Sequence, residues 1–97
     1  MAPNLSWNYP ILDLPGHRFL ILDGERANLT ETDFSGVTHA LVVNNFKPVE
    51  LPALPADVLL VVDGSNPYYR RGQWRELAEE RRMKVWVTGE DGALVLK

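Results

Sequence analysis

Three apolar runs stand out along the chain, and none of them alternates with polar positions. They predict strands at residues 17–23, 40–44 and 58–62. A continuous apolar run is typical of a strand that is buried on both faces, as in the parallel part of an α/β sheet. A half-exposed strand would instead alternate apolar and polar side chains. The pattern therefore favours strands with cover on both sides.

The hydrophobic period changes after the third strand. Long and apolar side chains recur at i, i+3, i+4 and i+7, namely at Trp74, Leu77, Ala78 and Arg81. This spacing predicts one helix, over about residues 70–82, that packs on the sheet through a single stripe. Pro67 suits the first helical position, because no bonded N–H is lost there. Since the helix connects them, the strands at 58–62 and 85–88 are expected to be parallel.

Two further apolar runs near the C-terminus, residues 85–88 and 93–96, flank the sequence Gly-Glu-Asp-Gly. That order suits a type I turn followed by a glycine in the left-handed region, so it predicts a C-terminal β-hairpin. Upstream, the prolines at positions 48, 52 and 55 exclude a regular helix. A loop or one short turn is expected over residues 47–56.

The first 16 residues contain three of the seven prolines. Proline cannot donate a hydrogen bond to a sheet ladder, so residues 1–16 are expected to form an extended lead-in or an edge strand. Residues 17–97 are then a single α/β domain. Its expected architecture is a small mixed β-sheet with the one helix and the hairpin.

Composition agrees with one small globular domain. The 97 residues are 45 % hydrophobic and 24 % charged, which excludes a disordered chain and a coiled coil. The absence of cysteine excludes disulfides and thiolate zinc sites. The longest apolar run has five residues, against about 20 for a bilayer-spanning helix, so this chain is not expected to insert into a membrane. The net charge of −3 speaks against a general coating of nucleic acid.

The loop after the strand at 58–62 is the candidate site: Asp63, Gly64, Ser65 and Asn66. It leaves the carboxyl end of a buried strand and enters a helix, which is where open α/β sheets hold ligands. Backbone N–H groups at such a helix start can bind an anion. The alternative interpretation is a tight turn in which Asp63 and Ser65 or Asn66 cap the helix. The spaced glycines and the lysine of a nucleotide-binding P-loop are missing from it.

No pattern in the chain predicts a catalytic residue, a metal or a cofactor. The two histidines, His17 and His39, stand 22 positions apart and lie at the starts of different strands. They are interpreted as ordinary strand-end side chains rather than zinc ligands. Ser65 lacks the G-x-S-x-G elbow that exposes a nucleophile.

A basic segment coincides with the predicted helix. Residues 66–84 contain six bases and three acids, whereas the rest of the chain contains four bases and ten acids. Aromatic side chains beside basic ones are typical of surfaces that bind single-stranded nucleic acid. The candidate DNA contacts are Arg70, Arg71, Arg75, Tyr68 and Tyr69. The alternative is a solvated helix face with ion pairs, such as Glu79 with Arg75 or Arg82.

Several segments resemble the extreme C-terminus of ComEC-type competence proteins, in the version found in Bacteroidetes. That version has a D-[GA]-S-N loop, a K/R-x-W helix and a closing G-A-[FY]-[VI]-L strand. The matching segments here are residues 56–66 with the loop Asp-Gly-Ser-Asn, the helix containing Trp74, and residues 88–93 ending in Gly-Ala. Residues 17–24 and 41–45 are similar to the family's two upstream strands, so the resemblance covers residues 17–96.

The resemblance implies an integral membrane protein that carries single-stranded DNA into a bacterium during natural transformation. It also implies that this chain forms the C-terminal half of a metallo-β-lactamase-like domain. In members with an intact site the corresponding loop reads H-H-G-S, and its histidines serve metal and chemistry. Here Val62 and Asp63 stand at those positions, and only Gly64 and Ser65 match. The upstream H-x-H-x-D-H cluster has no counterpart in the chain.

The expected function is that of a non-catalytic soluble domain of a DNA-uptake protein of the bacterial cytoplasmic membrane. Its expected contacts are single-stranded DNA, bound weakly, or other parts of the parent protein. The resemblance does not imply which side of the membrane the domain faces. The alternative function is enzymatic: the chain would be part of a metal-dependent hydrolase whose site is completed by residues outside it.

Overall fold

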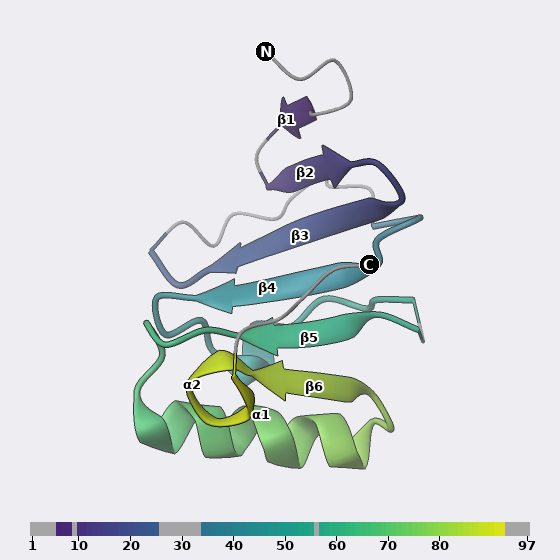
Figure 1. The fold of residues 1–97 in the computed structure, drawn as a ribbon. Helices are drawn as coiled ribbons and strands as arrows, with labels where there is room; N and C mark the ends of the chain where they lie inside the picture. Colours follow the sequence, from purple (N-terminus) through teal and green to yellow (C-terminus); the bar gives the residue numbers. More distant parts are fainter. Residues whose placement is uncertain (1–5, 9, 26–33, 56, 93–97) are drawn as a thin grey trace.

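In the part of the chain that the structure describes, six strands form one sheet in the order β1-β2-β3-β4-β5-β6, so each strand lies beside its neighbours in the chain (Figure 1). The structure is a computed structural model, and it describes residues 6–8, 10–25, 34–55 and 57–92. The strands are β1 (Ser6–Asn8), β2 (Ile11–Leu14), β3 (His17–Asp23), β4 (His39–Val43), β5 (Leu59–Val62) and β6 (Lys84–Val87). The helical elements are the 3-10 helix η1 (Pro48–Glu50) and the α-helices α1 (Tyr68–Glu80) and α2 (Thr88–Asp91).

The sheet is mixed, as the sequence predicted. β1, β2 and β3 pair antiparallel, whereas β3, β4, β5 and β6 pair parallel. β5 and β6 flank α1 in the chain, and their parallel pairing confirms the prediction for the strands on either side of the helix. The parallel arrangement brings the carboxyl ends of four strands to one edge of the sheet (Figure 1).

The described part of residues 1–16 belongs to the sheet, so the domain begins before residue 17. Pro15 and Gly16 form the turn that pairs β2 with β3. Gly16 has a φ of 77°, which glycine adopts without a steric penalty. Pro10 lies between β1 and β2, and its carbonyl accepts a hydrogen bond of 2.7 Å from the N–H of Ile21. The described residues of this stretch therefore form strands, in agreement with the second of the two interpretations.

One face of the sheet and α1 enclose the hydrophobic core. Alternate residues of the parallel strands contribute to it: Leu20, Leu22, Ala40, Val42, Leu60, Val62 and Val87. From α1, Trp74 and Ala78 are buried in this core, and Leu77 is half-buried against it. The predicted packing of the helix through these three side chains is confirmed. Arg81 lies just after the helix and is exposed, so the stripe ends at Ala78.

The opposite face of the sheet is also apolar. Phe19, Ile21 and Val61 are buried on it, and Leu41 and Trp86 are half-buried. β3 and β5 are therefore buried on both faces, as their continuous apolar runs predicted. β4 alternates between buried and half-buried positions.

The connection from β4 to β5 forms one short turn, η1, as the prolines predicted. Phe46, just before it, is buried, and its ring stacks near the Trp74 ring with centroids 6.3 Å apart. The Trp74 Nε1–H also donates to the Phe46 carbonyl at 3.3 Å. These contacts attach the connection to α1.

Within the described ranges, no helix is both long enough and apolar enough to cross a bilayer.

α1 begins and ends two residues earlier than the predicted span of 70–82. Pro67 occupies the N-cap with an extended backbone, not the first helical position. At the other end Arg82 has a φ of 56°, and the N–H of Met83 bonds to the Ala78 carbonyl at 2.8 Å. A left-handed residue, followed by a residue whose N–H bonds back to the last helical turn, ends a helix. The spacing of apolar side chains does not indicate this backbone conformation, which is why the predicted helix was too long at that end.

The segment after β6 differs from the predicted hairpin. Thr88–Asp91 form the short helix α2 rather than a type I turn. The Asp91 Oδ2 accepts a hydrogen bond of 2.9 Å from the N–H of Val87 and lies 3.0 Å from Nη2 of Arg75. This carboxylate holds the helical turn against β6 and α1. Residues 93–96, the second strand of the expected hairpin, lie outside the described residues.

Candidate functional site

Polar residues follow each parallel strand at the edge where the carboxyl ends meet. Asp23 ends β3, Asn44 and Asn45 follow β4, and residues 63–66 follow β5. The parallel register places these three loops next to one another. The candidate loop at residues 63–66 is therefore one member of a set of three. Sequence reasoning identified this member and missed the other two.

Asp63 and Ser65 form a closed hydrogen-bonded pair within the loop. The Asp63 Oδ1 accepts from the backbone N–H of Ser65 at 2.8 Å and from its hydroxyl. The Ser65 Oγ in turn accepts a hydrogen bond of 2.8 Å from the N–H of Asn44. The hydroxyl proton therefore points to a carboxylate, and the oxygen faces a neighbouring backbone amide. This arrangement joins two loops and is not that of a serine activated by histidine.

Asn66 is the most enclosed polar residue of the edge, with 1 % of its surface exposed. Its Nδ2 donates to the carbonyls of Val42, at 2.8 Å, and Asp63, at 3.0 Å. Its Oδ1 accepts from the N–H of Asn45 at 3.0 Å. α1 has no side-chain cap, so the interpretation of Asp63, Ser65 or Asn66 as helix caps is wrong. Ser65 and Asn66 instead accept hydrogen bonds from the β4 loop, and Asp63 accepts from Ser65.

The β4 loop has an unusual backbone that fits this bonding. Asn44 and Asn45 both adopt left-handed φ values, 53° and 63°. Asparagine tolerates this region better than most residues with a Cβ. The Asn44 Nδ2 donates to Asp23 Oδ1 at 3.0 Å, and a Cβ on Gly24 would lie only 2.0 Å from the Asn44 carbonyl oxygen. The Asn-Asn sequence after a buried strand is the signal in the sequence that indicates this turn.

The three candidate DNA-contacting arginines have different surroundings. Arg75 pairs with Glu90 and Asp91, both at 3.0 Å. Arg71 donates from Nε to the Asn66 carbonyl at 2.9 Å. Arg70 donates to Asn45 Oδ1 at 2.6 Å and to the Gln73 side chain at 2.7 Å. The predicted partner of Arg75, Glu79, does not pair with it, because α2 supplies two closer carboxylates.

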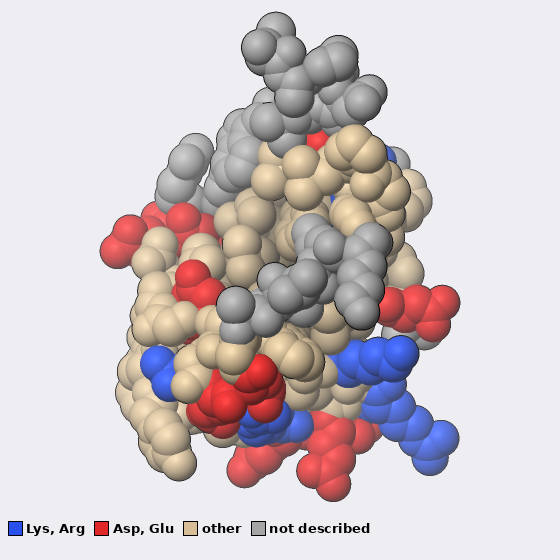
Figure 2. Space-filling model, viewed as in Figure 1, with Lys and Arg blue, Asp and Glu red and all other residues tan. Residues whose placement is uncertain are grey.

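The tyrosines are the most exposed of the candidate DNA contacts. Tyr68 is 80 % exposed and Tyr69 is 59 % exposed, both in the first turn of α1. The Arg70 guanidinium lies over the Tyr69 ring, 5.2 Å from its centroid. On the face shown in Figure 2, acidic and basic side chains are mixed over the region of α1 and α2. The structure thus groups Tyr68, Tyr69 and Arg70 and sets Arg75 apart from them.

The histidines lie at the amino ends of β3 and β4, away from the candidate loop. The rings of His17 and His39 meet edge to face with centroids 5.4 Å apart, and His39 stacks on Phe19 at 4.7 Å. The Nδ1 of His39 is 2.7 Å from the Thr38 hydroxyl. Sequence reasoning treated the two histidines as separate, but parallel pairing of β3 and β4 brings them together. In the described part of the chain, no three His, Cys, Asp or Glu side chains form a group that could hold a metal.

The histidine contact predicts a pH-dependent stability. Burial, and then the neighbouring His17, lower the pKa of His39 below its ordinary value. Near and below about pH 6.5 the folded state therefore binds fewer protons than the unfolded state, so the free energy of unfolding falls as the pH drops. We expect His39→Gln to flatten the dependence between about pH 7.5 and 5.5, measured by urea denaturation. An unchanged slope in this variant would contradict the assignment, and Lys47→Gln, an exposed position, is the control.

Comparisons with family models, with curated proteins and with solved structures found no match for this chain.

Proposed function

We propose that the chain is a non-catalytic domain of a ComEC-type DNA-uptake membrane protein. The observation that supports this proposal is that the separate segments of the resemblance meet at one edge of the sheet. Asp23 bonds to Asn44, Asn44 bonds to Ser65, and Asn45 bonds to Asn66. The parallel register alone brings these strand ends together, so the support lies in the polar residues of the resemblance that bond to one another there. Trp74, the helix residue of the resemblance, is fully buried and attaches α1 to the same sheet.

The bonding at this edge supports a structural rather than a catalytic role for residues 63–66. Asp63 is used by Ser65, and Asn66 is buried with two donated bonds and one accepted bond. Groups that hold loops together in this way stiffen the edge. The alternative, a hydrolase site completed by residues outside the chain, would need some of these atoms to turn outward. The proposal therefore assigns the loop to the fold and the contact with DNA to the exposed first turn of α1.

Tyr68, Tyr69 and Arg70 are the residues we assign to single-stranded DNA. The tyrosine rings are exposed for stacking on bases, and the guanidinium beside Tyr69 is placed to meet a phosphate. All three arginines are bonded to the protein. Arg70 and Arg71 donate to neutral oxygens and keep their positive charge, whereas Arg75 pairs with the carboxylates of Glu90 and Asp91. Binding is expected to be weak and insensitive to base sequence, because the contacts are stacking and charge and the chain has a net charge of −3.

A titration with a thymidine oligonucleotide of about 15 nucleotides tests this assignment, because one short binding surface spans fewer bases than that. We expect amide signals of the first turn of α1 to shift, and the affinity to fall steeply from about 50 to about 200 mM salt. Tyr68→Ala with Tyr69→Ala is expected to lower the affinity about tenfold or more, since each stacked base contributes about 1–3 kcal/mol. Arg81→Gln, an exposed base beyond the helix, is the matched control.

Two results would contradict the proposal. The first is an oligonucleotide that shifts no signal of the first turn of α1 at low salt, or an equal loss of affinity in Arg81→Gln. The second is cleavage of single-stranded DNA that disappears in Asp63→Ala, because this would support the alternative function, a hydrolase.

In the source bacterium, the tyrosine double variant is expected to lower the frequency of natural transformation.

A further inference from the structure

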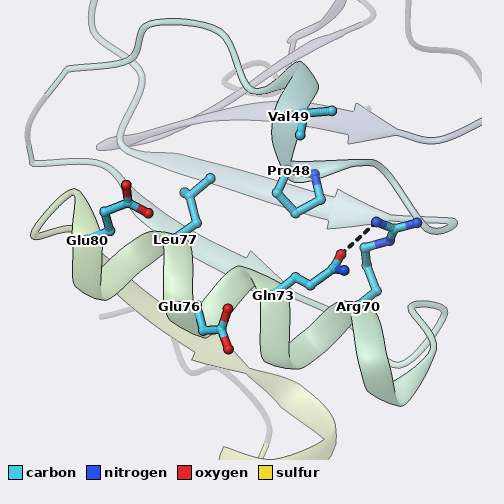
Figure 3. Close-up of a pocket in the computed structure, with 7 residues that line it drawn as sticks. All are labelled: Pro48, Val49, Arg70, Gln73, Glu76, Leu77 and Glu80. Atoms are coloured by element: carbon cyan, nitrogen blue, oxygen red, sulfur yellow. Dashed lines mark hydrogen bonds between the residues drawn. The ribbon is translucent and has the colours of Figure 1, made fainter.

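A groove lies between α1 and η1 (Figure 3). Its volume is about 270 Å³. The residues that line it are Pro48 and Val49 from η1, and Arg70, Gln73, Glu76, Leu77 and Glu80 from α1. Small-molecule pockets begin at about 300 Å³. This groove is therefore suited to one or two side chains rather than to a whole cofactor.

The middle of the groove is apolar. Leu77 and Pro48 stand on its facing walls (Figure 3). Val49, on its rim, is 89 % exposed, which makes it the most exposed large hydrophobic side chain among the described residues. Tyr69 lies on the same stripe of α1, one turn before Gln73. An apolar side chain of a partner placed in the groove would cover Val49 and complete the contacts of Leu77.

The two ends of the groove differ in charge. Glu76 and Glu80 are one turn apart on α1, and neither forms an ion pair with another described residue. Like charges at this spacing destabilise a helix, so a cation between them would be favourable. At the other end, Arg70 donates to the neutral side chains of Gln73 and Asn45 and keeps its positive charge. The groove therefore has a basic end at Arg70 and an acidic end at the acid pair, Glu76 and Glu80, which repels a phosphate backbone.

We propose that this groove binds a peptide segment of a partner protein in which an apolar side chain stands close to a lysine or arginine. The apolar side chain lies between Leu77 and Val49, and the base pairs with Glu76 and Glu80. The charge of the acid pair selects the basic partner at this end of the groove. The groove meets the proposed DNA contact at Arg70, which lines its other end. The two contacts of the peptide, with Leu77 and Val49 and with the acid pair, involve neither Arg70 nor the tyrosines.

A set of acetylated and amidated peptides of about seven residues tests the groove, because a segment of this length covers a single surface. Each peptide has one leucine and one lysine at a spacing of one to four residues in a Gly-Ser background, and a matched set has glutamate for lysine. We expect at least one lysine peptide to shift the amide signals of Val49, Gln73 and Glu76, and no glutamate peptide to do so. Glu76→Gln with Glu80→Gln should weaken binding about three- to tenfold, the range for two exposed ion pairs.

Glu79→Gln is the matched control, because Glu79 is exposed on the same helix but does not line the groove. Val49→Ser should weaken binding without changing the fold, since Val49 is almost fully exposed. Equal effects of Glu79→Gln and of the acid-pair variant would overturn the proposal, as would equal binding of both peptide sets or of neither. Shifts of the groove signals with rising protein concentration would show instead that a second copy occupies the groove. Shifts of Val49 and Glu80, at the end of the groove away from Arg70, on adding the thymidine oligonucleotide would assign the groove to nucleic acid.

Discussion

Trp74→Ala is expected to lower the free energy of unfolding by about 3–5 kcal/mol, the range for removing a large aromatic side chain from a core. Trp74 is fully buried, stacks near Phe46 and donates a hydrogen bond to the Phe46 carbonyl. The substitution leaves a cavity between α1 and the sheet and an unpaired carbonyl. Because domains of this size are stable by only about 5–15 kcal/mol, the variant should lose between about a fifth and all of its stability. Urea denaturation followed by circular dichroism measures the change.

Two variants serve as controls for this substitution. Trp74→Phe keeps an aromatic ring beside Phe46 and should cost less, about 1–3 kcal/mol. Tyr68→Ala removes an aromatic side chain of the same helix that is 80 % exposed, and should change stability by no more than about 0.5 kcal/mol. A Trp74→Ala variant as stable as Tyr68→Ala would mean that α1 does not pack on the sheet as described.

Asn66→Ala is expected to cost about 1–3 kcal/mol, because it leaves the Asn45 N–H without the Asn66 oxygen that accepts from it. The carbonyls of Val42 and Asp63 lose the Asn66 side chain but keep a bond from a backbone N–H. Of the bonds between the β4 and β5 loops, the one from Asn44 to Ser65 remains. The amide signals of Asn44 and Asn45 should therefore move, although both residues are distant in sequence from the substitution. Denaturation and an amide spectrum of the same sample report the two effects.

Asn66→Asp keeps the acceptor oxygen of this side chain and removes its N–H donors. The aspartate still accepts from Asn45, but its ionised carboxylate faces the two carbonyls that Asn66 Nδ2 contacts, so the charged form is disfavoured. The pKa of the new carboxyl is expected to rise, and the variant should regain part of its stability as the pH falls towards 5. Ser65→Ala, in the same loop but exposed, should cost less than about 1.5 kcal/mol. An Asn66→Ala variant no weaker than Ser65→Ala would contradict the role assigned to Asn66.

The strands and the helix that rest on local patterns could be predicted from the sequence. The continuous apolar runs placed β3 and β5 within a residue of their observed bounds, and the spacing of Trp74, Leu77 and Ala78 identified the packed face of α1. These features are local, since the period of apolar side chains along a segment indicates which of its faces can be buried. The parallel pairing of β5 with β6 followed from the helix between them.

Features that depend on long-range contacts were decided only by the tertiary structure. β2 exists because it pairs with β3, and α2 replaces the expected turn because the Asp91 carboxylate bonds to Val87 and meets Arg75 on another helix. In the same way, β3 and β4 bring His17 and His39 together, although 22 positions separate them. A local pattern does not contain these partners.

The candidate site has a feature that the sequence determined and a feature that only the tertiary structure decided. The sequence by itself determined that residues 63–66 form a polar loop at the carboxyl end of a buried strand, because the apolar run ends there and a helix follows. Only the tertiary structure decided what these residues do, because Ser65 and Asn66 bond to Asn44 and Asn45, each 21 positions away. Hydrogen bonds between the ends of neighbouring strands depend on register and on the left-handed backbone of the β4 loop, and both exist only once the sheet has formed.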